Sequence, residues 1–157
     1  KILAETVPSR TQIEQPVSAD IQARALSKHV LVVDDSSVAR KQILRCLEGV
    51  GVEVTALCDG RQALQFLQKM ADEGRRPEDE LLMVISDIEM PEMDGYTLTA
   101  EIRQDPRLQG LHVLLHTSLS GVFNQAMVQK VGADDFLSKF RPDELADRVI
   151  ARIEARD

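Results

Sequence analysis

Five short apolar runs alternate with longer segments in which apolar residues recur every three or four positions. The first run, residues 30–33, is apolar at every position, which is typical of a strand that is buried on both faces of a sheet. The other four runs are residues 52–57, 81–86, 113–116 and 135–138. Each run precedes a helical pattern, so the chain predicts five strands that alternate with helices.

The helical segments begin and end at residues that favour helix termini. The first helix is expected to follow the capping side chains at residues 35–37, to cover residues 39–50 and to end at Gly51. A second helix is expected to run to Met70. The last begins near Pro142, a favourable first-turn residue. Its apolar stripe consists of Leu145, Val149, Ile150 and Ile153.

The alternation of strands and helices predicts an α/β fold, a doubly wound parallel sheet of five strands with helices on both faces. Residues 72–80 are expected to form a polar connection, which is long for such a turn. In sheets of this kind, ligands bind beyond the carboxyl ends of the strands. Candidate chemistry is therefore expected in the residues that directly follow the strands.

The first part of the chain differs from the rest. Residues 1–28 are interrupted by Pro8 and Pro16, and no apolar period runs through them. They are predicted to be a linker or tail from an upstream domain, with a short helix over residues 19–28. The domain itself is predicted to span residues 29–157. The absence of an initiating Met suggests a fragment of a longer protein.

Composition narrows the class of protein. The 157 residues suit one domain, and 3% aromatic content makes an aliphatic core the expectation. The formal charge of -7 argues against nucleic-acid binding, which needs a basic face. The longest apolar run, residues 81–85, is too short to span a membrane. Cys46 and Cys58 have no metal-like spacing, so both are predicted to be small buried side chains in a cytoplasmic protein.

Polar side chains follow four of the five predicted strands. Asp34 and Asp35 follow the first, Asp87 the third, Thr117 the fourth and Lys139 the fifth. Two carboxylates about 4 Å apart repel by roughly 4 kcal/mol at an effective dielectric of about 20. Three of them therefore need a cation, and Mg²⁺ prefers such oxygen ligands. One carboxylate could then attack a metal-bound phosphoryl donor to form an aspartyl phosphate.

Each of these residues also has an ordinary structural explanation. Asp35 could cap a helix, Asp87 could open a turn, and Lys139 could be a surface lysine. His116 is interpreted as a strand residue that fills space, because no partner for it is evident. The joint placement of the polar residues at one sheet edge favours a site over these separate explanations.

Four segments carry a resemblance to a known family: residues 30–36 (VLVVDDS), 84–95 (VISDIEMPEMDG), 114–118 (LLHTS) and 132–139 (GADDFLSK). In this order they resemble the receiver domain of two-component response regulators, over residues 29 to about 155. The resemblance implies a flavodoxin-like sheet with strand order 2-1-3-4-5. It also implies a phosphorylation-dependent switch that assists its own phosphorylation and dephosphorylation and is otherwise no enzyme.

The resemblance assigns roles to the acidic residues. It implies that Asp87 is the phosphoacceptor and that a histidine kinase is the donor. Mg²⁺ would be held by Asp34, Asp35, Asp87 and the backbone carbonyl of Glu89, with Asp35 a direct ligand. No other cofactor is implied.

The resemblance also assigns the remaining site residues. Thr117 and Lys139 would hold the phosphoryl group, and Phe136 occupies the position of the family's switch aromatic, which acts together with Thr117. The chain departs from the family after Lys139, where proline is usual and Phe140 stands instead. This departure leaves open a degenerate receiver that binds partners without phosphate.

A narrower resemblance concerns residues 115–126 (LHTSLSGVFNQA), followed later by Lys139 and Phe140. These are similar to the receiver half of the CheV chemotaxis coupling proteins, which carry a CheW-like scaffold domain ahead of the receiver. The partners implied are a CheA-like histidine kinase and, through the missing scaffold domain, chemoreceptors. Residues 1–28 would then be the linker from that domain.

A phosphatase of the haloacid dehalogenase type is an alternative from another class, because it also uses an aspartate after a strand. Such an enzyme requires a second aspartate two residues after the nucleophile. Glu89 stands at that position, and the acidic pair at residues 34–35 has no role in that scheme. The sequence therefore disfavours this alternative.

Overall fold

The chain adopts the predicted doubly wound α/β fold. The structure is a computed structural model that describes residues 17–117, 125–137 and 141–156. Five parallel strands form one sheet in the order β2-β1-β3-β4-β5, as the family resemblance implies. The strands are β1 (His29–Val33), β2 (Glu53–Leu57), β3 (Met83–Asp87), β4 (Val113–His116) and β5 (Asp135–Leu137).

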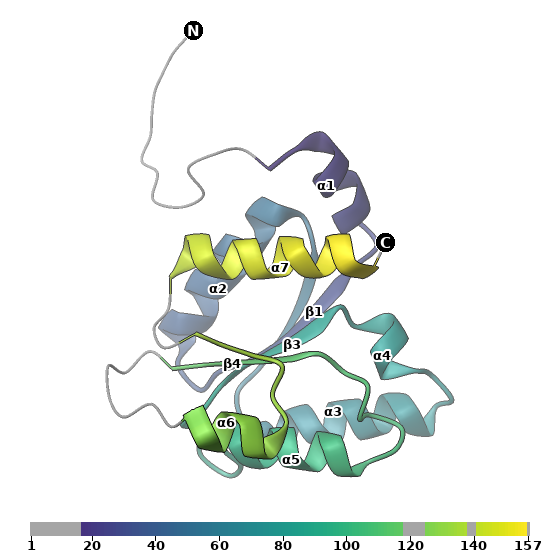
Figure 1. Cartoon of the computed structure of the whole chain (residues 1–157), viewed down its shortest axis with the longest axis vertical. Coiled ribbons are helices and arrows are strands. Elements are labelled where there is room, and N and C mark those ends of the chain that lie inside the picture. Colours follow the sequence, from purple (N-terminus) through teal and green to yellow (C-terminus); the bar gives the residue numbers. More distant parts are fainter. Residues whose placement is uncertain (1–16, 118–124, 138–140, 157) are drawn as a thin grey trace, which may run out of the picture.

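Helices cover both faces of the sheet (Figure 1). One layer contains α1, α2 and α7, which contact one another, and the opposite layer contains α3, α5 and α6. Short α4 lies beside the end of α3. The helices are α1 (Ala19–Ala25), α2 (Ser37–Val50), α3 (Gly60–Asp72), α4 (Pro77–Glu80), α5 (Gly95–Gln104), α6 (Gln125–Val131) and α7 (Pro142–Arg156).

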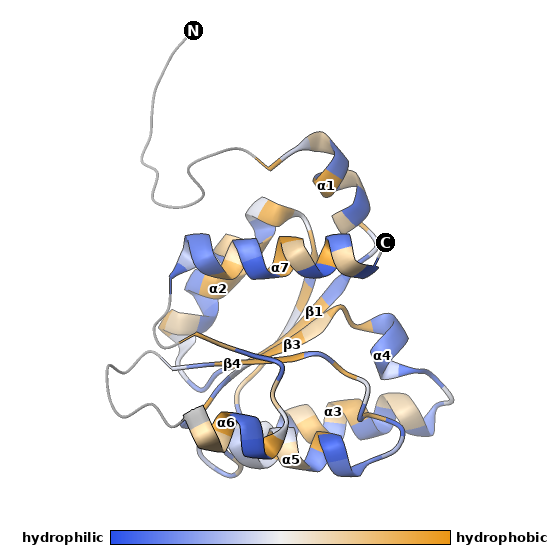
Figure 2. Ribbon diagram, viewed as in Figure 1, coloured by the Kyte–Doolittle hydropathy of each residue, from blue (hydrophilic) through white to orange (hydrophobic). Residues whose placement is uncertain are grey.

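Side chains along β1 alternate between two apolar clusters, one on each face of the sheet. Val30 and Val32 join the cluster that includes α2 and α7, whereas Leu31 and Val33 join the cluster that includes α3 and α5. All four are fully buried, as their continuous apolar run predicts. Figure 2 shows the apolar positions concentrated in the strands and on the inner faces of the helices.

The predicted helix ends are confirmed in α2. The Ser36 hydroxyl accepts a hydrogen bond from the Ala39 N–H at 3.2 Å. Gly51 ends the helix at φ 106°, a left-handed backbone conformation that glycine adopts more readily than other residues. Its N–H donates a hydrogen bond to the Leu47 carbonyl at 3.0 Å. These caps satisfy backbone groups that have no partner inside the helix.

A short helix precedes β1, as predicted, and it ends at Ala25. The Ser18 hydroxyl accepts a hydrogen bond from the Ile21 N–H at 3.1 Å and caps the helix. Ile21 and Ala25 are buried in the cluster that includes α2 and α7. α1 therefore belongs to the packed structure of the domain.

Two details differ from the sequence predictions. The connection at residues 72–80 contains α4, which starts at Pro77 because proline suits the first turn of a helix. Cys46 is buried as predicted, but the same prediction for Cys58 is wrong. Cys58 follows β2, which is an edge strand, and it is exposed there. The described part of the chain contains no helix with the length and apolar character needed to cross a membrane.

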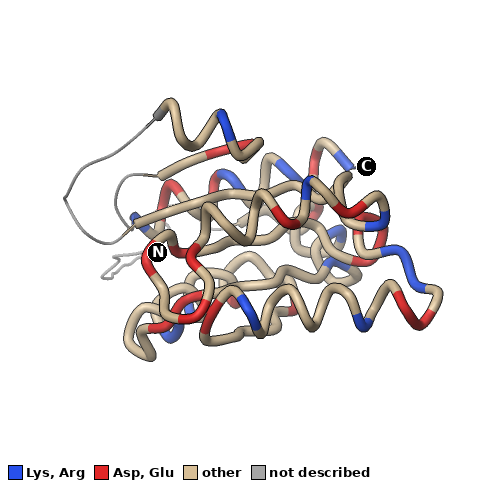
Figure 3. Tube along the Cα trace, turned by 90° about the horizontal axis from the view of Figure 1, so that it is seen from below, with Lys and Arg blue, Asp and Glu red and all other residues tan. Residues whose placement is uncertain are grey.

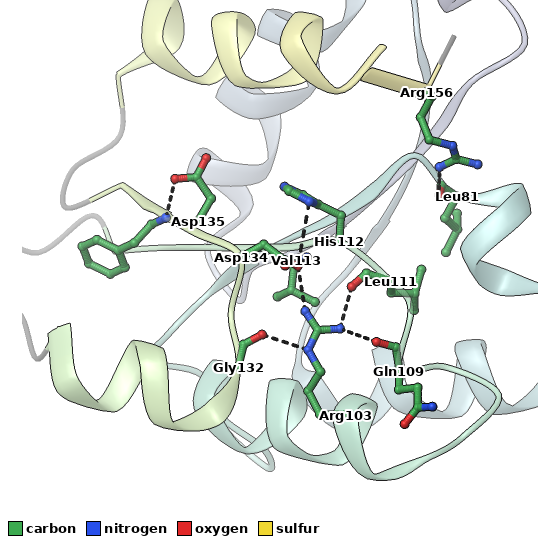
Figure 4. Close-up of polar contacts among 11 residues, drawn as sticks. Leu81, Arg103, Gln109, Leu111, His112, Val113, Gly132, Asp134, Asp135 and Arg156 are labelled. Atoms are coloured by element: carbon green, nitrogen blue, oxygen red, sulfur yellow. Dashed lines mark hydrogen bonds and ion pairs between the residues drawn. The ribbon is translucent and has the colours of Figure 1, made fainter. Parts of the chain in front are cut away.

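Arg103 joins α5 to the segments that precede β4 and β5 (Figure 4). Its guanidinium donates to the carbonyl of Gly132 at 2.8 Å and to that of Leu111 at 2.6 Å. It also donates to the Asp134 carboxylate at 2.7 Å and to the Gln109 carbonyl at 2.9 Å. Because the side chain is only 22% exposed, these charged hydrogen bonds are partly shielded from water.

We expect Arg103→Met to lower the free energy of unfolding by about 2–3 kcal/mol, because it leaves several carbonyls and a carboxylate without their donor. Urea denaturation of the purified chain measures this loss. Arg107→Met is the matched control, since Arg107 forms exposed ion pairs with Asp72 and Asp105 and such pairs contribute little. Equal losses in the two variants would contradict the role of Arg103.

Candidate functional site

The carboxyl ends of β1, β3 and β4 bring three titratable side chains together. Asp34 directly follows β1, Asp87 ends β3, and His116 ends β4 opposite Asp87 in the strand pairing. Their ligand atoms all lie within 4.8 Å of one another. Strand alternation explains this, because the residues two positions earlier share one apolar cluster. Those residues are Val32, Ile85 and Leu114.

The three side chains are almost completely buried. Asp34 is 2% exposed, His116 3% and Asp87 7%. Burial raises the pKa of Asp87 to about 7, and the nearby charge of Asp34 adds to this effect. Burial also raises the pKa of Asp34, although a hydrogen bond from the Ser36 backbone opposes it. Ionisation of both carboxylates is therefore unfavourable unless a cation is present.

Backbone hydrogen bonds orient the two buried carboxylates. Asp87 Oδ1 accepts from the Ile88 N–H at 2.8 Å, and Asp34 Oδ1 accepts from the Ser36 N–H at 2.9 Å. Arg40 donates to the Asp34 carbonyl at 2.7 Å and fixes the backbone between β1 and α2. Each carboxylate is therefore held by the turn that leaves its strand.

Gly95 allows α5 to begin directly against the end of β3. A Cβ at this position would lie 2.3 Å from the Asp87 carbonyl oxygen, which no side chain can tolerate. The Gly95 N–H donates to the Ile88 carbonyl at 2.8 Å, and Asp94 caps the helix. The segment between Asp87 and α5 therefore forms a tight turn beside the site.

The predicted metal ligands take different positions. Asp34 and Asp87 lie together, whereas Asp35 is exposed next to them. The charge of Asp35 still contributes to the raised pKa of Asp87, so the charges of both Asp34 and Asp35 act on Asp87. Glu89 is exposed in the segment after β3. In Figure 3, acidic positions lie at both ends of the molecule.

The other predicted site residues lie on β4 and β5 or just beyond them. Thr117 follows β4, is partly buried, and donates its backbone N–H to the Leu137 carbonyl at 3.3 Å. Phe136 lies in β5 and packs, partly buried, against the cluster that includes α3 and α5. Lys139 and Phe140 lie outside the described residues.

His116 is a buried residue of β4, as the sequence analysis interpreted it, and the structure also places it beside the acidic residues. Its Nε2 lies 3.6 Å from Asp34 Oδ2, and neither ring nitrogen has a hydrogen-bond partner among the described residues. Burial lowers the pKa of His116 to about 4, so the ring is neutral near pH 7. The register of the sheet explains this proximity, because His116 and Asp87 are paired across β3 and β4 and share a face.

The chemistry of the donor set fits a divalent cation. Two buried carboxylates and a third exposed one supply hard oxygen ligands, which Mg²⁺ prefers. A cation there would offset the repulsion that raises the pKa of Asp87. The residues present therefore suit a magnesium site, with Asp34, Asp35, Asp87 and the Glu89 carbonyl as its candidate ligands.

Comparisons with known proteins agree on one family. The profile described as response regulator receiver domain matches residues 30–150. Chemotaxis protein CheV3 of Helicobacter pylori is 30% identical over 134 residues, which is 83% of this chain and 42% of CheV3. The chain thus spans less than half the length of that relative. Two-component response regulator ORR11 of Oryza sativa subsp. indica is 35% identical over 80% of each chain.

A solved structure supports the same assignment. The receiver domain of a sensor histidine kinase from Pseudomonas aeruginosa superposes with a TM-score of 0.67 at 26% identity, covering 82% of this chain and 98% of its own. Its active-site cleft holds a coordinated magnesium ion.

The raised pKa of Asp87 predicts a pH-dependent stability. The folded protein binds the Asp87 proton more tightly than the unfolded chain, so this contribution to stability is present at low pH and is lost as pH rises toward about 7. In metal-free buffer, Asp87→Asn should therefore gain stability over the native chain between about pH 4 and pH 8. The gain is on the order of a few kcal/mol, because one pKa unit equals about 1.4 kcal/mol.

Urea denaturation at several pH values, with a chelator present, measures this difference. Asp147→Asn is the matched control, because Asp147 is exposed on α7. It should not reproduce the gain expected of Asp87→Asn. A pH-independent difference for Asp87→Asn would contradict the raised pKa.

Proposed function

Because the chain belongs to the response regulator receiver domain family, we propose that it is a phosphorylation-dependent switch of a bacterial two-component system. In this proposal Asp87 accepts a phosphoryl group from a histidine kinase with the help of Mg²⁺. The main observation in support of this proposal is that Asp87 lies at the end of β3, buried beside Asp34 and oriented by a backbone hydrogen bond. The domain acts as a phosphoacceptor that assists its own phosphorylation and dephosphorylation, with no other enzyme activity.

Magnesium would be held by Asp34, Asp35, Asp87 and the backbone carbonyl of Glu89. When bound, it would neutralise the carboxylates and the oxygens of the incoming phosphoryl group. The magnesium coordinated in the similar receiver domain from Pseudomonas aeruginosa supports this proposal. The raised pKa of Asp87 supports it too, because a site that disfavours its own negative charge gains most from a cation.

Phosphoryl transfer would use the side chains at the strand ends. The ionised Asp87 carboxylate attacks phosphorus, the bond from phosphorus to the donor imidazole nitrogen breaks, and its electron pair returns to that nitrogen. The Thr117 hydroxyl would donate to a phosphoryl oxygen, and the Lys139 ammonium would offset its charge. The backbone bond from Ile88 keeps the carboxylate oriented during the attack.

The signal would spread from the site through β4 and β5. Thr117 is already joined to β5 by the hydrogen bond from its N–H to the Leu137 carbonyl. A shift of Thr117 toward the phosphoryl group would therefore act on β5, where the partly buried Phe136 is the proposed switch aromatic. The surface formed by α6, β5 and α7 would change as a result.

Chemotaxis is the pathway we propose for this switch. The similarity to CheV3 supports it, together with residues 115–126, which resemble the CheV receiver. A CheA-like kinase would then be the phosphoryl donor. An upstream CheW-like scaffold domain, reached through residues 1–28, would connect the protein to chemoreceptors. Such a protein would act in the cytoplasm, without contact to nucleic acid or membrane.

Phosphorylation by a small-molecule donor tests the proposal directly. We expect incubation with acetyl phosphate and Mg²⁺ to add one phosphoryl group, seen as a single adduct in the intact mass. Asp87→Asn should show no adduct, and a chelator should prevent it in the native chain. The reason is that both the nucleophile and the charge-neutralising cation are needed for the transfer.

Asp147→Asn is again the control, because it removes an exposed carboxylate on α7 while leaving the strand ends intact. It should form the adduct like the native chain. If the folded native chain formed no adduct, the proposed switch would be wrong. A phosphate-independent binding module, with the altered sequence after Lys139 as its cause, would then be favoured.

A further inference from the structure

His116 is a buried polar side chain that the proposed phosphoryl transfer does not use. It is 3% exposed, and both of its ring nitrogens lack a hydrogen-bond partner among the described residues. Burying an imidazole without a partner costs stability, so a residue of this kind points to a ligand that satisfies it. A space-filling role alone would be served better by leucine, which precedes it at Leu114 and Leu115.

The imidazole is directed at the acidic site. Its Nε2 lies 3.6 Å from Asp34 Oδ2, which is too long for a hydrogen bond. The ligand atoms of Asp34, Asp87 and His116 all lie within 4.8 Å of one another. Ligands about 2.0–2.2 Å from one ion lie at most about 4.4 Å apart. The three ligand atoms are therefore separated by distances close to those of ligands that share one cation.

Imidazole is a common metal ligand, and neither ring nitrogen of His116 has a hydrogen-bond partner among the described residues. An imidazole nitrogen suits first-row transition ions, whereas magnesium prefers a shell of oxygen atoms. The histidine therefore bears on which cation the site selects.

We propose that His116 supplies a nitrogen ligand to the cation held by Asp34 and Asp87, and that this ligand raises the affinity of the site for ions such as Co²⁺ and Mn²⁺ relative to Mg²⁺. The inference rests on the proposed function only in placing a cation at these carboxylates. It adds a ligand and a metal preference to that site.

Pulsed electron paramagnetic resonance of the Mn²⁺ complex tests the ligand directly, because a coordinated imidazole gives a ¹⁴N coupling to the metal. We expect this coupling in the native chain and its loss in His116→Leu and His116→Asn. Histidine labelled with ¹⁵N should convert the native signal to a ¹⁵N coupling. The labelling experiment needs no substitution and shows that the coupled nitrogen belongs to a histidine, and the histidine variants then identify which one.

The two other histidines supply matched controls. His29 lies 3.7 Å from Glu53, and His112 lies 3.8 Å from Asp134, so each could bind a metal elsewhere on the chain. His29→Gln and His112→Asn should keep the coupling. Titration calorimetry should show Mn²⁺ affinity falling on the order of tenfold in His116→Leu, with a smaller change for Mg²⁺.

The inference is overturned if the native chain binds no Mn²⁺, or if bound Mn²⁺ shows no nitrogen coupling. It is also overturned if the coupling survives in His116→Leu and disappears in a control variant. These results are separate from the test of the proposed function. An Asp87 adduct with Mg²⁺ but no nitrogen coupling removes the inference alone, whereas coupling without an adduct removes the proposed switch alone.

Discussion

Burial of the central strands on both faces is the constraint on which the rest of the structure depends. β1 and β3 lie inside the sheet between two helical layers, so each of their apolar side chains joins one of the two apolar clusters. A polar group there would lose its hydration without compensation. Polar chemistry is therefore confined to the positions where the strands leave the sheet, and the parallel arrangement places those positions at one edge. The carboxylates of Asp34 and Asp87 gather for this reason.

The same arrangement lowers the stability of the fold when no cation is bound at the site. Burial raises the pKa values of Asp34 and Asp87, the charge of Asp34 adds to the effect on Asp87, and the His116 imidazole lies 3.6 Å from Asp34. Backbone N–H groups offset part of this cost by binding one oxygen of each carboxylate. The fold tolerates the remainder because the apolar clusters on both sides are large and continuous. A site of this kind is poised to respond to added positive charge.

Much of the fold could be predicted from local patterns in the sequence. The apolar run at residues 30–33 identifies a doubly covered strand without any tertiary information, and Ser36 and Gly51 mark the ends of α2. The position of Asp87 follows from the end of β3. What escaped prediction depends on strand pairing and sheet position. The proximity of His116 to the acidic residues needs the register with Asp87 across the sheet, and the exposure of Cys58 needs the knowledge that β2 is an edge strand.

The packing of α1 sets the boundary of the cooperative folding unit. Ile21 and Ala25 are buried among residues of α2 and α7, whereas the family match begins only at residue 30. A chain shortened to that match would expose this apolar surface to water. α1 also holds the chain that enters β1 against the helical layer. A displacement of this helix would consequently disturb its packing against both α2 and α7.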